Sequence, residues 1–273
     1  MTTAQPQTSP PDAGFAENHV EADGFRIRYC EAGDGPVLVH LHGAGGMRLN
    51  RAHDRLARSH RVIAFEMPGF GKSAENTRTR DQAELARTMI RAADALRLDR
   101  FDLWGTSFGG RTALWLAAQA PERVGALVLE ASAAIRPAGV IPPSGTSEQM
   151  ARLVFAHPER MPPVVLPDAA VQAQTRALVM RLRGPERDAA LEAALPQLAT
   201  PTLVLFGTED RLMPPELGHL YKRLMPNAHL AFVYDAGHAI GAERPEAFTE
   251  IVDDFLDRHE AFVISRNKTA LFP

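Results

Sequence analysis

The stretch Trp104-Gly105-Thr106-Ser107-Phe108-Gly109-Gly110 decides the fold of this 273-residue chain. It follows an apolar run at 101–104 and leads into a mostly apolar segment at 108–119, so it predicts a strand, a sharp turn and a helix. A serine in such a turn projects its hydroxyl away from the sheet, and the flanking glycines avoid collisions with neighbouring backbone. Chance would give a G-x-S-x-G pattern on the order of 0.04 times in a chain of this composition. We therefore expect Ser107 to be a nucleophile rather than a simple helix cap.

The same alternation of strand and helix extends to both sides of this turn. Short apolar runs bounded by turn residues are typical of strands buried on both faces of a parallel sheet. Helices are predicted where apolar residues recur every three or four positions. Asp23-Gly24 lies between two alternating runs within 19–31 and predicts a hairpin. The result is an α/β fold with a mostly parallel central sheet and helices on both faces. The predicted strands are 37–41, 61–65, 101–104, 124–129, 203–206 and 230–234, and the predicted helices are 81–96, 108–119 and 243–257.

Proline divides the chain into regions. Residues 132–196 hold nine of the 21 prolines, a density that fits short helices joined by stiff turns rather than strands. We interpret this segment as a small helical cap inserted into the sheet domain, the alternative being a long surface excursion without a role. The expected organisation is a disordered tail at 1–14, a core at 15–131 and 197–260, the cap at 132–196 and an extension at 261–273.

A serine nucleophile needs a base and a group that orients the base. His238 lies in Asp235-Ala236-Gly237-His238-Ala239, just after the last predicted strand, and is the best placed of the ten histidines. Asp210 follows the preceding strand, 28 residues earlier, and the ends of parallel strands meet at one edge of the sheet. We therefore predict Asp210 as the acid. Glu130, at the end of another strand, is the rival acid.

An oxyanion formed in the reaction needs hydrogen-bond donors. The segment His42-Gly43-Ala44-Gly45-Gly46 follows the first central strand, and its glycines allow backbone amides to face the site. The predicted donors are the amides of Ala44 and Phe108. Met47 below the site, and Met150 and Phe155 from the cap, are expected to line a moderately hydrophobic substrate pocket.

Composition excludes several other classes of protein. The net charge is −3, and the chain has one cysteine and no long apolar stretch, so we expect no nucleic acid, no membrane and no disulfide. The start of the chain has neither a basic nor an apolar signal region, which favours a cytoplasmic location. Gly69-Phe70-Gly71-Lys72-Ser73 fails as a P-loop because Glu66 occupies the position of its first glycine. We expect no cofactor and no metal, and a small-molecule substrate as partner, with a homodimer as an open alternative.

These motifs together resemble the α/β-hydrolase superfamily. The resemblance covers about 15–259 and rests on HGAGG (42–46), EMPGFGKS (66–73), GTSFGG (105–110), GTEDRLMP (207–214) and DAGHAIGAERPEAF (235–248). It implies Ser107 as nucleophile, His238 as base and Asp210 as acid, with no cofactor. One departure is Glu66, where the superfamily's D-x-P-G-x-G-x-S loop has aspartate.

The resemblance is closest to capped bacterial esterases and to the C–C hydrolases of aromatic ring-cleavage products. The latter often have tryptophan after the catalytic histidine, where this chain has Ala239. We therefore expect a carboxylesterase-like serine hydrolase that forms an acyl-enzyme. The alternatives are a C–C hydrolase of ring-cleavage products, a hydrolase-fold protein that only binds a ligand, and a cofactor-free perhydrolase. Six arginines of the cap are interpreted mainly as a solvated face, from which one could contact an acidic substrate: Arg152, Arg160, Arg176, Arg181, Arg183 and Arg187.

Overall fold

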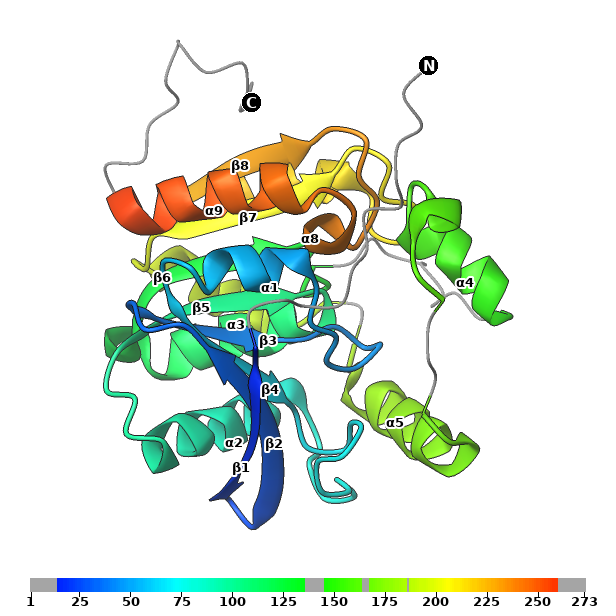
Figure 1. Cartoon of the computed structure of the whole chain (residues 1–273). Coiled ribbons are helices and arrows are strands. Elements are labelled where there is room, and N and C mark those ends of the chain that lie inside the picture. The colour runs from blue at the N-terminus through cyan, green and yellow to red at the C-terminus, as the bar shows by residue number, and fades with distance from the viewer. Residues whose placement is uncertain (1–13, 136–144, 164–166, 186, 260–273) are drawn as a thin grey trace.

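A computed structural model describes residues 14–135, 145–163, 167–185 and 187–259. Within these residues one sheet of eight strands runs through the molecule in the order β1-β2-β4-β3-β5-β6-β7-β8 (Figure 1). The strands are β1 (Ala16–Ala22), β2 (Phe25–Ala32), β3 (Val37–Leu41), β4 (Arg61–Glu66), β5 (Phe101–Thr106), β6 (Val124–Glu130), β7 (Thr202–Gly207) and β8 (Ala228–Val233). The expected tail at 1–14, apart from Gly14, and the extension at 261–273 lie outside the described residues.

Six strands, from β4 to β8 in the sheet order, are parallel, and β2 joins β4 antiparallel. The strands β1 and β2 form the predicted hairpin, in which Ala22 pairs with Phe25. Asp23 and Gly24 make its turn, both with positive φ (49° and 71°), which explains the Asp-Gly pair. The mostly parallel α/β class expected from the sequence is confirmed.

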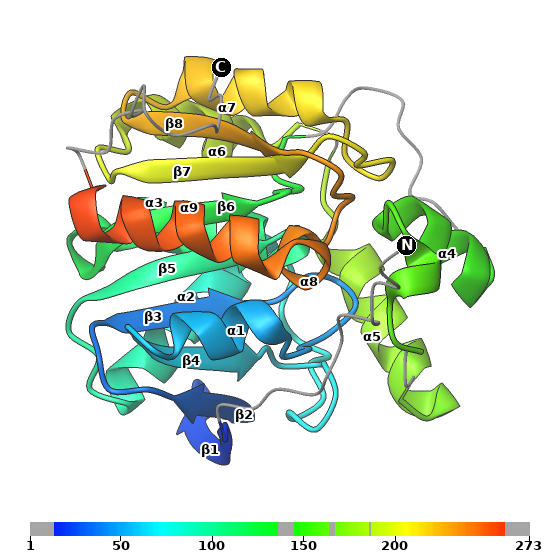
Figure 2. The same ribbon diagram turned by 45° about the horizontal axis from the view of Figure 1, so that its top comes forward.

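Helices cover both faces of the sheet (Figure 2). The alternation of side chains along a strand sends Leu203 and Leu205 of β7 to one face, and Val204 and Phe206 to the other. The first face is covered by α1 (Arg51–Leu56), α8 (Ile240–Glu243) and α9 (Pro245–Arg258). The second is covered by α2 (Gln82–Ala95), α3 (Phe108–Gln119), α6 (Ala189–Ala194) and α7 (Gly218–Leu224).

Two further helices, α4 (Ser147–Val154) and α5 (Ala169–Leu182), lie beyond the carboxyl ends of the parallel strands (Figures 1 and 2). The carbonyl of Val154 at the end of α4 accepts a hydrogen bond from the amide of His238. Thr175 of α5 donates to the carbonyl of Gly69, in the loop that follows β4. These two helices are therefore attached to two different loops at the same edge of the sheet.

Candidate active site

Ser107 lies in a strained turn between β5 and α3. Its φ of 52° and ψ of −111° are unusual for a residue with a side chain, and such strain is characteristic of functional turns. The neighbouring glycines let the turn pack closely. A Cβ on Gly109 would lie 2.1 Å from the carbonyl oxygen of Leu41, and one on Gly105 would lie 2.6 Å from Cβ of Ala113. The G-x-S-x-G spacing is thus required by the packing of α3 against β3 and β5.

His238 and Asp210 form a buried hydrogen-bonded pair. His238 Nδ1 and Asp210 Oδ2 are 2.8 Å apart, and each residue is 6% exposed. The other oxygen of Asp210 accepts the amides of Leu212 and Met213, at 2.9 and 2.8 Å, which fixes the plane of the carboxylate. His238 Nε2 is buried and has no hydrogen-bond partner among the described residues, Ser107 included. The ring is therefore oriented by Asp210, with one nitrogen free to exchange a proton.

The loop after β8 turns back across the sheet toward Ser107. The amide of Gly241 in α8 donates to Glu130 Oε1 at 2.8 Å, and the amide of Ser107 donates to the carbonyl of Glu130 at 2.9 Å. The serine turn and the histidine loop thus meet at the end of β6. Glu130, the rival acid, makes no hydrogen bond with the ring of His238, whereas Asp210 does.

The peptide between Gly43 and Ala44 is held in one orientation. The carbonyl of Gly43 accepts from His42 Nδ1 at 2.7 Å and from the amide of Gly46 at 3.1 Å. Burial lowers the pKa of His42 to about 4, so its ring is neutral at pH 7. The amide of Ala44 points opposite to this fixed carbonyl. The amide of Phe108 belongs to the first turn of α3, where helical amides lack an intrahelical acceptor.

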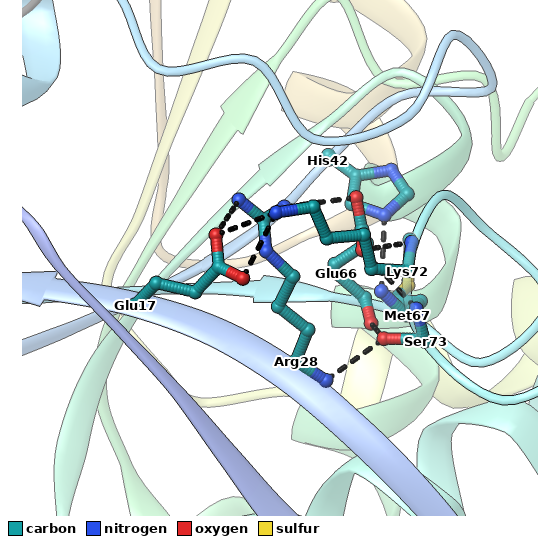
Figure 3. Close-up of polar contacts among 7 residues, drawn as sticks. All are labelled: Glu17, Arg28, His42, Glu66, Met67, Lys72 and Ser73. Atoms are coloured by element: carbon teal, nitrogen blue, oxygen red, sulfur yellow. Dashed lines mark hydrogen bonds and ion pairs between the residues drawn. The ribbon is translucent and has the colours of Figure 1, made fainter. Parts of the chain in front are cut away.

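Glu66 stabilises the loop that follows β4, although the related motif has aspartate there (Figure 3). Its carboxylate accepts the amides of Lys72 and Ser73, at 2.6 and 3.2 Å, and pairs with Arg28 at 3.1 Å. In the same loop the amide of Met67 donates to His42 Nε2 at 3.0 Å. The departure at Glu66 therefore leaves an ordered loop, which supports His42 and, through it, the peptide of Ala44.

The predicted pocket residues Met47, Met150 and Phe155 are all half-buried. Phe155 follows Val154, whose carbonyl accepts the amide of His238 at 2.7 Å, so the structure brings this end of α4 to the histidine loop. Glu243 strengthens the attachment, since it accepts the amides of Gly237 and His157 at 2.7 and 3.1 Å. The pocket roles of Met47 and Met150 stay predictions.

Most of the cap arginines have partners within the protein. Arg152 pairs with Glu148, Arg160 with Asp235, Arg187 with Glu192, and Arg181 donates to the carbonyls of Thr79 and Asn76. Arg176 is exposed on α5. The described ranges contain no group of three or more His, Cys, Asp or Glu side chains placed to hold a metal ion. No helix within them has the length and apolar character needed to span a bilayer.

Comparison with known proteins defines the class. A family model described as the alpha/beta hydrolase fold matches residues 36–191, more than half of the chain, and the protein belongs to this family. It is a hydrolase of that fold. The chain is 30% identical to a 2-hydroxymuconate semialdehyde hydrolase of Pseudomonas putida, over 94% of this chain and 98% of that protein.

Two solved structures add to this result. A membrane phospholipase A from a bacterium is 27% identical, with a TM-score of 0.79 over 90% of this chain and 86% of the other. A serine hydrolase involved in carbazole degradation is 26% identical, with a TM-score of 0.76 over 89% of this chain and 99% of the other. The name of the Pseudomonas relative agrees better with the expected alternative, a C–C hydrolase, than with an esterase.

Of the residues packed beneath Ser107, the sequence pointed only to Glu130, as a rival acid, and gave no role to His53, His40 or Thr106. His53 looks like a surface residue because its helix, Arg51–Leu56, is polar, yet it is 1% exposed and 3.0 Å from His40 Nδ1. Thr106 and Glu130 are also joined, at 2.7 Å. The available signal was Glu130 itself, an acid that ends the otherwise apolar strand Val124–Glu130.

Proposed function

We propose that this protein hydrolyses a carbon–carbon bond in a ring-cleavage product, a small dienoic acid with a second carbonyl group. The observation that carries the proposal is the buried pair of His238 and Asp210, with a free Nε2, at the same sheet edge as the strained Ser107. The 30% identity to a 2-hydroxymuconate semialdehyde hydrolase over nearly the full length supports this substrate class.

Ser107 is the proposed nucleophile. His238 Nε2 takes the proton of Ser107 Oγ as the oxygen attacks the substrate carbonyl, and Asp210 stabilises the imidazolium. The amides of Ala44 and Phe108 hold the oxyanion. The hydroxydienoate first shifts its enol proton to the carbon beside the attacked carbonyl, so that this carbon becomes saturated. Collapse then breaks the bond to this carbon, whose electron pair is delocalised into the conjugated oxo-enoate and which takes the proton from His238. Water, deprotonated by His238, then releases the acyl group as an acid and Ser107 regains its proton.

The helices α4 and α5 form the proposed cap over this site. Met47, Met150 and Phe155 would line its apolar part. Because the end of α4 is bonded to the histidine loop, the substrate would be enclosed between this helix and the sheet edge. A closed apolar pocket excludes bulk water, which strengthens the electrostatic effects on the reacting groups.

The first test is Ser107→Ala, assayed with purified protein on a ring-cleavage product whose conjugated chromophore disappears on hydrolysis. We expect kcat to fall by about 10³-fold or more, because the remaining oxyanion donors give only residual catalysis. A fluorophosphonate probe should label the unaltered protein and leave the variant unlabelled. Hydrolysis that persists undiminished in the variant would reject Ser107 as nucleophile and, with it, the proposal.

Arg48 is the proposed partner of the substrate carboxylate. It follows Ala44 by four residues, and no described residue pairs with its guanidinium. Arg48 is exposed, although desolvation by the surrounding protein lowers the pKa of its guanidinium, so the side chain is accessible to a bound anion. We expect Arg48→Gln to raise KM for the acidic substrate by about tenfold, roughly the loss of one charged hydrogen bond. KM for a neutral ester should stay the same, and an equal rise for both substrates would contradict this role.

Ester hydrolysis is the second candidate. Two observations favour it: Ala239 replaces the tryptophan that often follows the histidine in the C–C hydrolases, and the fold is similar to that of a phospholipase A. Comparing kcat/KM for 2-hydroxymuconate semialdehyde with that for p-nitrophenyl acetate and butyrate separates the two reactions. If kcat/KM is at least 10²-fold higher for the esters, ester cleavage becomes the proposed reaction in place of C–C cleavage, with the same site residues.

A further inference from the structure

A continuous chain of hydrogen bonds runs beneath the serine turn, from the start of α1 to the end of β6. His53 Nδ1 is 3.2 Å from the amide of Asn50, and His53 Nε2 is 3.0 Å from His40 Nδ1. His40 Nε2 is 3.1 Å from Thr106 Oγ1, and this hydroxyl is 2.7 Å from Glu130 Oε2. The chain therefore joins two buried imidazoles to a buried carboxylate through Thr106, the residue that precedes Ser107.

The donors in this chain follow from its ends. Thr106 uses its only hydroxyl proton to donate to Glu130, so His40 Nε2 must donate to Thr106. His40 Nδ1 then accepts from His53 Nε2. His53 Nδ1 lies 3.2 Å from the amide of Asn50 and 3.0 Å from Oδ1 of the same residue, and in the neutral ring it accepts from the amide. Each ring carries one proton and is neutral, in agreement with burial, which lowers the pKa of His40 and brings that of His53 to about 3. The chain contains no cation.

Glu130 is a buried carboxylate without a basic partner. It is 3% exposed and accepts hydrogen bonds from Trp104 Nε1 at 3.0 Å, from Thr106 and from the amide of Gly241. No lysine or arginine of the described ranges pairs with it. Burial raises the pKa of Glu130, while these donors and the nearby charge of His238 act in the opposite direction. A buried charge of this kind costs stability, which favours a functional role.

We propose that Glu130 is a positioning residue for the reaction, which holds the serine turn and the histidine loop together and stabilises the positive charge that forms on His238. This inference rests on the proposed function, since it requires that His238 accept a proton. The proton moves only from Ser107 Oγ to His238 Nε2, and none is transferred to Glu130. Glu130 acts through space and through Gly241, whereas Asp210 acts through its direct bond to Nδ1.

Other charged groups also surround the histidine loop. Asp210 contacts the ring from the loop after β7, and Glu243 of α8 accepts the amide of the preceding Gly237. Asp235 begins the loop and pairs with His157, which follows α4. Burial raises the pKa of Glu243, and the bond to His157 lowers that of Asp235. A test of Glu130 must therefore change this carboxylate alone and leave the other groups in place.

The decisive experiment compares Glu130→Gln with Glu130→Asp. Imidazole ¹H–¹⁵N NMR follows the pKa of His238 directly, and the acidic limb of kcat/KM reports the same pKa in the free enzyme through its activity. If the negative charge stabilises the imidazolium, the glutamine variant should shift both to lower pH by about 0.5 to 1 unit and lower kcat by about tenfold. The aspartate variant keeps the charge, so the acidic limb of its kcat/KM profile should stay within about 0.2 pH units of that of the wild type.

Asp102→Asn is the matched control. Asp102 is a largely buried carboxylate on β5, at the opposite end of the sheet, and burial raises its pKa too. Its replacement should leave the pKa of His238 and the pH profile unchanged. If Glu130→Gln fails to fold, as judged by near-UV circular dichroism, Trp104→Phe provides the second variant. It removes one donor to the carboxylate, which raises the pKa of Glu130 and lowers its ionised fraction, so the acidic limb should shift in the same direction by a smaller amount.

A purely structural role would lower kcat or stability without moving the pKa of His238, and this outcome would overturn the inference. The NMR titration needs no substrate, so it distinguishes this failure from failure of the proposed function. If Ser107→Ala keeps full activity, the reaction has been misassigned, whatever Glu130 does. If Ser107→Ala is inactive while Glu130→Gln leaves the titration unchanged, only the role of Glu130 is rejected.

Discussion

Asp210 and Glu130 lie at the carboxyl ends of neighbouring strands, β7 and β6, and both are buried, but they have different partners. Asp210 lies three residues beyond its strand, so its side chain reaches the ring of His238 at 2.8 Å. Glu130 is the last residue of its strand, and its side chain bonds to the neighbouring strand through Trp104 and Thr106, and to Gly241. A carboxylate three residues beyond a strand end thus reaches the ring of His238, whereas one at the strand end bonds to groups around it.

The environments of the two carboxylates differ as well. Asp210 accepts two backbone amides and one imidazole, all within the loops at the sheet edge. Glu130 is the end of a hydrogen-bond chain that crosses β6, β5 and β3 on the face of the sheet covered by α1, and reaches that helix. A change at Asp210 should therefore affect mainly the reaction. A change at Glu130 or at another member of its hydrogen-bond chain should also lower the stability of the fold.

The largest difference between the two regions is expected for Asp210→Asn. The amide would favour the wrong tautomer of His238, so kcat should fall by about 10³ to 10⁴-fold. This loss exceeds the roughly tenfold loss expected from removing a charge that acts through space, as for Glu130→Gln. Steady-state kinetics of the two variants, on the same substrate and at the same pH, give the comparison. A larger loss for Glu130→Gln would reverse the two roles and make Glu130 the acid.

A smaller effect concerns stability in acid. His53 belongs to the hydrogen-bond chain that ends at Glu130. Burial lowers its pKa to about 3, against about 6.5 in the unfolded chain. Below pH 6.5 the unfolded state binds a proton that the folded state does not, so stability falls as the pH falls toward 3. At pH 5.5 the lowered pKa of His53 therefore reduces the free energy of unfolding by about 1.4 kcal/mol. Burial lowers the pKa of His40 as well, so it adds in the same direction.

Urea denaturation at pH 7.5, 6.5 and 5.5 measures this loss. The variant His53→Gln should have a lower stability at pH 7.5 but a weaker dependence on pH, because one of the depressed titrations is absent. A free energy of unfolding that is the same at all three pH values would contradict the inference that His40 and His53 are buried as neutral rings. The donor directions assigned to the hydrogen-bond chain would then be wrong as well.

The order of the site along the chain was predictable from the sequence. Ser107 is marked by its glycines, and Asp210 and His238 each follow an apolar strand, whose parallel neighbours end at the same edge. The fold class was predictable for the same reason, since strands and helices differ in the spacing of their apolar residues. These signals are local and depend on neighbouring residues in the chain.

The tertiary structure alone decided how distant residues share the interior. His53 is buried because α1 packs on the sheet beside α9, and nothing in Arg51–Leu56 encodes that neighbour. The partners of Glu130 come from β5 and α8, up to 111 residues away, and Glu66 finds Arg28 across the antiparallel pair of β2 and β4. Buried polar groups must find partners, but which partners they find depends on packing over long distances along the chain. The sequence by itself therefore determined the elements and the order of the candidate reacting residues, while folding determined the network that holds them.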